Sequence, residues 1–298
     1  MPAPQSARPH NLAGLAKLVA QTRSKVTYIA GGTDLVMALG KGELPEVIVD
    51  ISQLAELNFV DTGDQALRLG AATTMAALAR LPDIDPALAA LSQAARQFGS
   101  VQIRNRATIG GNIASAMPAG DLLAVLQCLD CRIEVLRDGQ ITTHELQDIV
   151  TGAGQTSLGN GDLIVAISFP RPSRANRRSA FAKLGPRQEM TIACLCLAIS
   201  AHYFPDTNRI GDVRLVAGAV GPVPVRLFSV EQALNGRSVD QNLADDFLHA
   251  LSAAVDAEIA ERASRPYKRR AIMGLGLDLL AALFGTEFKL ALPFGGIA

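Results

Sequence analysis

Apolar residues in the first part of the chain alternate between helical and strand-like spacing. Leu12, Leu15, Leu18 and Val19 recur at helical intervals and predict an amphipathic helix over residues 12–20. Apolar runs at 26–30 and 46–51 have strand length, and the second is continuous enough to predict burial on both faces. A short helical pattern lies between them. This order of strand, loop, helix and strand predicts a small α/β unit.

A second unit follows, in which strand and helix patterns are mixed. Thr73 or Thr74 is positioned to cap a helix that runs to Arg80. Asp138-Gly139, between two short apolar runs, predicts a tight hairpin turn. The pattern predicts strands at 66–70, 132–136, 140–142 and 162–169, and helices at 87–98 and from Asp121 onward.

Residues 170–178 mark the clearest boundary, because this stretch is rich in proline and arginine and has no apolar face. We interpret it as a solvated linker; the alternative is that its arginines grip a phosphate or an acidic partner. Beyond it the pattern predicts antiparallel strands at 180–184, 191–203 and 212–219, then helices at 225–234, 242–259 and 267–283. The predicted organisation is a first domain over 1–172, with subdomains of about 1–55 and 56–172, a second over 178–285, and a tail at 286–298.

Composition narrows the class of protein. The chain has 298 residues, a formal net charge of zero and 49% hydrophobic residues. Nothing in it resembles the concentrated basic surface of a nucleic-acid binder. No apolar run reaches the roughly 18 residues of a membrane span, and the first residues lack a signal-peptide core, so we expect no membrane span and a cytoplasmic location.

The four cysteines, Cys128, Cys131, Cys194 and Cys196, suggest a metal or iron–sulfur site by their spacing. All four lie in apolar runs, however, where free cysteine acts as a small hydrophobe. We therefore interpret them as core residues and predict no metal on this chain.

Two glycine pairs provide the strongest chemical signal. Ala30-Gly31-Gly32-Thr33-Asp34 follows the first strand pattern, and Thr108-Ile109-Gly110-Gly111-Asn112 continues to Ala114, Gly120 and Asp121. Glycine permits positive φ angles and close approach of a ligand, and consecutive N–H groups in such turns can bind an anion. Either pair alone fits an ordinary tight turn. The two together favour two loops closing on one phosphate-bearing ligand.

The segments from Tyr28 to Asp34 and from Gln102 to Ile113 resemble the FAD-binding medium subunit of the molybdenum hydroxylases, the family of xanthine dehydrogenase and the carbon monoxide dehydrogenase flavoprotein. The resemblance extends over nearly the whole chain. It implies an α+β fold, with a two-subdomain FAD-binding domain of the PCMH/vanillyl-alcohol-oxidase type and a C-terminal domain of a three-stranded antiparallel sheet and a helical bundle. It also implies FAD as cofactor, whereas molybdopterin and the [2Fe-2S] clusters would reside on a large and a small partner subunit in a dimer of heterotrimers. Electrons would pass from the clusters through FAD to a small-molecule acceptor.

The resemblance and the glycine pattern together predict the cofactor-binding residues. Backbone N–H groups of both motifs would contact the diphosphate, with hydroxyl and amide donors from Thr33, Thr108 and Asn112. Asp121 resembles the family's acceptor of hydrogen bonds from flavin-side hydroxyls; the alternative is a helix N-cap. Lys183 resembles the family's basic residue near the flavin ring. For Asp34 we expect a capping or loop-bracing role. The predicted set is Tyr28, Ile29, Ala30, Gly31, Gly32, Thr33, Asp34, Phe98, Ala107, Thr108, Gly110, Gly111, Asn112, Ala114, Gly120, Asp121 and Lys183, for several of which core packing is the alternative.

No acid–base or nucleophile constellation stands out, so we predict no catalytic side chain of this chain's own. Two other functions are kept open: a self-contained FAD-dependent oxidoreductase of the same cofactor fold, and a cofactor-free scaffold subunit. We also predict that Gly111→Val abolishes FAD binding while leaving the fold largely intact, because a β-branched side chain could neither adopt a positive φ in this turn nor let a phosphate approach.

Overall fold

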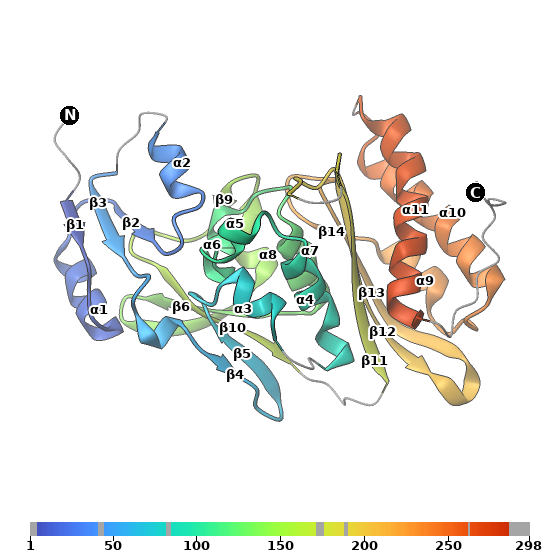
Figure 1. The fold of residues 1–298 in the computed structure, drawn as a ribbon, viewed down its shortest axis with the longest axis horizontal. Helices are drawn as coiled ribbons and strands as arrows, with labels where there is room; N and C mark the ends of the chain where they lie inside the picture. Colours follow the sequence, from blue (N-terminus) through green and yellow to red (C-terminus); the bar gives the residue numbers. More distant parts are fainter. Residues whose placement is uncertain are drawn as a thin grey trace.

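The computed structural model describes residues 5–40, 45–81, 85–170, 176–187, 190–261 and 263–285. Within these ranges the chain forms three units that follow one another across the molecule, each built on a sheet (Figure 1). A small parallel sheet lies at one end, a larger antiparallel sheet with several helices lies in the middle, and a second antiparallel sheet carries the long C-terminal helices. The predicted α+β class, with a two-part first region and a separate second domain, is confirmed.

The first unit is a three-stranded parallel sheet in the order β1-β3-β2. Asn11 begins its first helix by accepting a hydrogen bond from the Gly14 N–H at 2.7 Å, which satisfies one otherwise unpaired donor of the first turn. The central strand is buried on one face only, because Ile48 and Asp50 stay half-exposed; the prediction of burial on both faces is wrong. The elements are β1 (Gln5–Ala7), α1 (Leu12–Gln21), β2 (Val26–Ile29), α2 (Leu35–Leu39) and β3 (Val47–Asp50).

The second unit is built on an antiparallel sheet in the order β4-β5-β10-β6-β7. Positive φ angles at Asp138 (50°) and Gly139 (77°) confirm the predicted hairpin turn, and Thr74 rather than Thr73 caps α3. The strands are β4 (Val60–Asp61), β5 (Ala66–Gly70), β6 (Arg132–Arg137), β7 (Gln140–Glu145), β8 (Val150–Gly152), β9 (Gln155–Thr156) and β10 (Leu163–Pro170). The helices are η1 (Ala55–Leu57), α3 (Met75–Ala79), η2 (Pro86–Leu88), α4 (Ala89–Arg96), α5 (Val101–Arg104), α6 (Ile109–Ser115), α7 (Asp121–Cys128) and α8 (Leu146–Ile149).

The C-terminal unit has the three predicted long strands and one more. Val225 and Arg226, assigned to a helix from the sequence, instead pair with β13 as a short edge strand, and the helix starts only at Phe228. Its elements are β11 (Arg177–Leu184), β12 (Leu195–Phe204), η3 (Pro205–Thr207), β13 (Arg209–Gly218), β14 (Val225–Arg226), α9 (Phe228–Leu234), α10 (Gln241–Glu258) and α11 (Arg265–Phe284).

Both faces of this C-terminal sheet are buried. On one face Phe181, Cys196 and Val216 belong to the same core as helices α4 and α7 of the second unit. On the other face Leu197 and Leu215 belong to the core of the C-terminal helices, in which α11 packs on β12 and α9 packs on β13. Strands covered on two sides need apolar residues at successive positions, which explains the nearly unbroken apolar run of β12. The sheet therefore joins the second unit and the C-terminal helices through continuous packing.

The arginine-rich boundary is shorter than the sequence suggests. Residues 171–175 lie outside the described residues, but Arg177 and Arg178 already belong to strand β11, so their assignment to a solvated linker is wrong. Arg177 is buried, donates to Ser200 Oγ at 2.9 Å and forms an ion pair with Asp212. The Arg178 guanidinium lies 4.7 Å from the centre of the Tyr203 ring. The partners of these two arginines therefore lie in the C-terminal unit itself.

The cysteines lie where the apolar pattern places them. Cys128, Cys131 and Cys196 are buried, and Cys194 is half-buried just before β12. Burial raises the pKa of each buried thiol to about 12, so these thiols stay protonated in the core. Among the residues that the structure describes, no three His, Cys, Asp or Glu side chains gather in a way that could hold a metal ion. The same residues include no helix with the length and apolar character of a bilayer span.

Candidate functional site

The structure brings the first glycine motif into direct contact with the segment that leads into the second. A Cβ atom placed on Gly31 would lie 1.8 Å from the carbonyl oxygen of Arg106, in the segment that leads into the second motif. The Arg106 Nε–H in turn donates to the Gly31 carbonyl at 3.3 Å. Only glycine allows the two backbones to approach so closely.

The first motif is a loop between β2 and α2. Gly32 has a φ of 75°, a conformation that glycine adopts without steric cost. The backbone N–H groups from Gly31 to Leu35 find no acceptor among the described residues. Asp34 precedes α2, but its side chain makes no capping hydrogen bond, so the predicted capping role is not seen. N–H groups without an acceptor at a helix start suit an anionic ligand.

The second motif is the first turn of helix α6 and not a turn with positive φ. Thr108 is its N-cap, and its Oγ1 accepts a hydrogen bond from the Gly111 N–H at 3.1 Å. The N–H groups of Ile109 and Gly110 donate to the carbonyls of Thr73 and Ala71. Gly110 and Gly111 have helical φ angles, so the positive φ assumed for Gly111→Val is wrong, whereas the close approach of a phosphate stays a prediction.

Close packing explains the second glycine pair. A Cβ on Gly110 would lie 2.7 Å from the Cβ of Ala71, and a Cβ on Gly111 would lie 2.8 Å from Thr108 Oγ1. Because the N–H groups of this turn already have partners, the motif offers a ligand mainly the Thr108 hydroxyl and the Asn112 side chain. The Oδ1 atom of Asn112 is buried and unpartnered, as expected for a group that awaits a ligand.

Between the motifs lie two adjoining cavities of about 290 Å³ and 690 Å³. Such volumes are typical of small-molecule and cofactor sites. Tyr28, Ala30, Thr108, Gly111 and Ala114 line both cavities, so the two form one cleft. The smaller cavity is lined in addition by Ile29, Gly31, Gly32, Thr33, Asp34, Leu35, Phe98, Ala107, Asn112 and Ser115, whereas Gly110 lines only the larger one.

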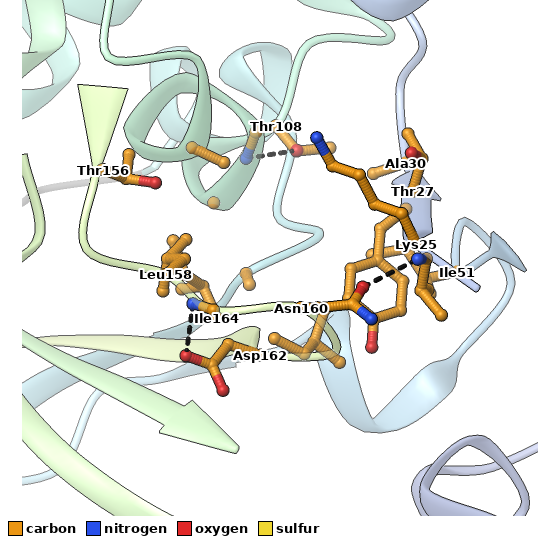
Figure 2. Close-up of a pocket in the computed structure, with 18 residues that line it drawn as sticks. Lys25, Thr27, Ala30, Ile51, Thr108, Thr156, Leu158, Asn160, Asp162 and Ile164 are labelled. Carbon is orange, nitrogen blue, oxygen red and sulfur yellow. Dashed lines mark hydrogen bonds between the residues drawn. The ribbon is translucent and has the colours of Figure 1, made fainter. Parts of the chain in front are cut away.

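The rest of the wall of the larger cavity is formed by residues that the sequence did not point to (Figure 2). They come from the start of β2 and from the turn 159–162 before β10. Asn160 Oδ1 accepts a hydrogen bond from the Val26 N–H at 2.8 Å, and the Tyr28 hydroxyl donates to the Gly161 carbonyl at 2.8 Å. Burial, followed by the charge of Asp162, raises the pKa of Tyr28 to about 12, so the phenol remains a donor. These bonds fasten the turn to the first unit.

Asp162 holds a negative charge at the wall of the larger cavity. Burial opposes its ionisation, but hydrogen bonds from Arg137 and from the Gly159 N–H outweigh that and lower the pKa of the carboxyl. The turn Gly159-Asn160-Gly161-Asp162 carries the composition of a structured polar turn, which is the signal that could have drawn attention to this wall.

Asp121 and Lys183 meet where the second unit packs against the C-terminal sheet. The Lys183 ammonium group donates to Asp121 Oδ2 and, at 3.1 Å, to the carbonyl of Gln97, beside Phe98. Both side chains are almost fully buried, with 7% and 3% exposure, and Asp121 Oδ1 has no partner. Burial raises the pKa of Asp121 to about 6, while the charge and hydrogen bond of Lys183 oppose the rise.

The predicted alternative role of Asp121 as a helix N-cap is wrong, since the N-cap of α7 is Gly120 and Asp121 is its first helical residue. Gly120, Asp121 and Lys183 line neither cavity. The structure therefore gathers most of the predicted residues around one cleft and places this last group beside it.

The chain is a three-unit α+β protein with a cleft between its first two units. An ion pair between Asp121 on α7 and Lys183 on the C-terminal sheet lies beside this cleft. Residues 3–172 match the family described as the FAD binding domain in molybdopterin dehydrogenase, and residues 180–282 match the CO dehydrogenase flavoprotein C-terminal domain. The chain belongs to this family of FAD-binding subunits of molybdopterin dehydrogenases. The resemblance and FAD as the family's cofactor are confirmed.

Relatives in sequence and structure agree with this membership. The FAD subunit of nicotinate dehydrogenase from Eubacterium barkeri is 29% identical over 265 residues, which cover 86% of this chain and 89% of that protein. The xanthine dehydrogenase FAD-binding subunit of Escherichia coli O157:H7 is 32% identical over 238 residues, 79% of this chain and 80% of its own length. A chain of carbon monoxide dehydrogenase from Hydrogenophaga pseudoflava has the same fold, with a TM-score of 0.83 at 23% identity and coverage of 95% and 97%.

Proposed function

We propose that this chain is the FAD-carrying electron-transfer subunit of a heteromeric molybdenum hydroxylase. Its partners are a large molybdopterin-binding subunit and a small subunit with two [2Fe-2S] clusters, assembled as a dimer of heterotrimers. Electrons pass from the clusters of the small subunit through FAD to a small-molecule acceptor. The union of the two glycine motifs in one cleft, with unpaired N–H groups on one side and an unpartnered Asn112 oxygen on the other, is the observation on which this proposal rests.

The residues of the cleft fit FAD. The free N–H groups from Gly31 to Asp34 would hold the diphosphate, together with the Thr108 hydroxyl. The buried Oδ1 atom of Asn112 would accept a hydrogen bond from a donor group of the cofactor. Asp121 lies beside the cleft and lines neither cavity, and its free Oδ1 would accept a hydrogen bond from a cofactor hydroxyl.

Bound FAD would supply the redox chemistry, which none of the side chains lining the cleft can perform. The side chains of this chain would position the cofactor and polarise it. Lys183 brings a buried positive charge to the edge of the site, where it favours negative charge on a nearby ring system. Asp121 fixes that ammonium group in place through their hydrogen bond.

Apolar side chains beside the cleft suit the docking of a partner subunit. Val36 and Met37 on α2 are 56% and 70% exposed, and Val101 on α5 is 58% exposed. Helix α2 follows the first motif directly and α5 precedes the second, and both lie on the same side of the molecule (Figure 1). Large apolar residues left exposed beside a binding cleft suit an interaction surface. We infer that the iron–sulfur subunit covers them, since electron transfer requires clusters close to the flavin.

Two measurements on the full chain test the proposal. Purified protein should show flavin absorption bands or take up one FAD per chain on reconstitution, and should not turn over purines, N-heteroaromatics, aldehydes or carbon monoxide alone. Co-purified with its large and small subunits, its flavin band should bleach on addition of the substrate of the complex. Turnover by the isolated chain would instead indicate a self-contained oxidoreductase, and absence of FAD uptake would indicate a scaffold subunit.

A further inference from the structure

Lys25 is a cation in the cleft whose role the glycine motifs do not explain. It lines the larger cavity, at the residue immediately before β2. Among the described residues that line the two cavities, Lys25 is the only one with a positive side chain; the other charged ones are Asp34 and Asp162. The charge of Asp162 is already balanced by Arg137.

The Lys25 ammonium group has no hydrogen bond or ion pair to any described residue, although the backbone beside it is firmly held. The neighbouring Val26 N–H donates to Asn160 Oδ1, and Asn160 donates back to the carbonyl of Ser24 at 3.2 Å. From this fixed base the Lys25 side chain extends across the cavity toward Thr108, the N-cap of α6 (Figure 2). A long cationic side chain held out over an open cavity is placed to meet an anion.

The second glycine motif does not by itself balance the negative charge of a bound diphosphate. A dinucleotide diphosphate carries two negative charges, and the N–H groups of Ile109, Gly110 and Gly111 already donate within the protein. On this side of the cleft, only the partial positive charge of the α6 N-terminus and the Thr108 hydroxyl remain to interact with the phosphates. The ammonium group that reaches toward Thr108 supplies the missing full charge.

We propose that Lys25 binds the diphosphate of the dinucleotide cofactor from the side opposite the first glycine loop. This inference rests on the proposed function, because it assumes that the cleft holds FAD. Lys25 then contributes to the selection of FAD over flavins without a diphosphate, since its contact is with the phosphates and not with the ring. Its contribution is electrostatic and exposed to solvent, so it weakens as salt increases.

The test is titration of the full-length apoprotein with FAD and with riboflavin, followed by flavin fluorescence at low and at high salt. Lys25→Gln should weaken FAD binding about tenfold at low salt and less at high salt, and should leave riboflavin binding unchanged. Lys25→Arg should keep most of the affinity. Lys17→Gln, which removes another exposed lysine, on α1, that lines neither cavity, is the matched control and should bind FAD like the wild type.

The outcomes separate this inference from the proposed function. Wild-type protein that binds FAD, with Lys25→Gln binding equally well, would overturn the role of Lys25 and leave the flavoprotein intact. An equal loss for riboflavin, or for Lys17→Gln, would overturn it as well. Wild-type protein that takes up no FAD would overturn both. Circular dichroism and thermal melting check that the variants fold, which we expect because the Lys25 ammonium group makes no hydrogen bond or ion pair with any described residue.

Discussion

The two glycine motifs share a sequence pattern and differ in what they offer a ligand. The first is a loop with a positive φ at Gly32 and a row of N–H groups without acceptors among the described residues. The second is the first turn of α6, in which Thr108 and the carbonyls of Ala71 and Thr73 take up the N–H groups. One motif is a donor surface, and the other is a packed helix end that leaves only side-chain groups free.

This difference shows that a glycine pair does not by itself define an anion-binding turn. At Gly31 and Gly110 the absence of a Cβ permits contact between backbones, whereas at Gly32 it permits a left-handed conformation. Close backbone contact and a left-handed conformation predict different effects when glycine is replaced by alanine. The variants below separate them, from the largest expected effect to the smallest.

Gly31→Ala should have the largest effect. The added Cβ would overlap the Arg106 carbonyl, which is backbone and cannot rotate away, so the two motifs must separate. We expect a loss of unfolding free energy of about 3 kcal/mol, at the upper end for overpacking, together with loss of FAD binding. Chemical denaturation and FAD titration measure the two effects. A stable variant with normal FAD affinity would show that the motifs need not touch.

Asp121→Asn should change the pH dependence of stability. Because burial raises the pKa of Asp121 from 3.8 to about 6, the native apoprotein holds a proton there that the unfolded chain has lost between about pH 4 and pH 6. The contribution of this carboxyl to stability is therefore complete below pH 4 and falls as pH rises toward 6, by about 3 kcal/mol in total.

The measurement is the unfolding free energy of the wild-type and Asp121→Asn apoproteins from pH 4 to pH 7. The substitution gives Lys183 a neutral partner at every pH, as the protonated carboxyl of the wild type does below about pH 6, so the informative quantity is how the difference in unfolding free energy between the two proteins changes with pH. The wild type should lose stability relative to the variant as pH rises. Curves that stay parallel would contradict the raised pKa.

Local signals explain which parts of the site the sequence revealed. The first loop follows a strand directly, and the cap of α6 is set by Thr108 three residues before the group it bonds, so both could be located from short segments. The helical conformation of Gly110 and Gly111 could not, because glycine is a weak helix former and the contact of Gly110 with the distant Ala71 helps to hold it there.

Long-range contacts account for what the sequence did not reveal. Val26 and Asn160, which shape the wall of the larger cavity, are 134 positions apart. The burial of Arg177 depends on Ser200 and Asp212, neither of which is visible as a partner from the boundary segment. A hydrophobic pattern reports which face of an element is buried, but not which distant polar group meets it.

Thr108→Ala should have a smaller effect than the two variants above. It removes the acceptor for the Gly111 N–H and a hydroxyl that lines both cavities. We expect a loss of about 1 kcal/mol in unfolding free energy and a several-fold weaker affinity for FAD. Thr74→Ala is the matched control, since Thr74 caps α3 in the same way but lines neither cavity. Thr74→Ala should lose a similar unfolding free energy but keep its affinity for FAD. If both variants lose affinity equally, the weaker binding of Thr108→Ala comes from lower stability and not from the lost hydroxyl.

The smallest effect separates the two glycine pairs most directly. Gly32→Ala forces a side chain into a φ of 75° and should cost about 1 kcal/mol in the apoprotein, whereas Gly32→Asn should cost less because asparagine tolerates this conformation. Gly111→Ala has no such cost, since the residue is helical; alanine's better helix propensity offsets its contact with the Thr108 hydroxyl. Thermal melting of the three apoproteins should therefore rank Gly32→Ala lowest. If Gly111→Ala has the lowest melting temperature instead, Gly111 and not Gly32 is the position that requires glycine. That result would contradict the loop conformation of the first motif and the helical conformation of the second.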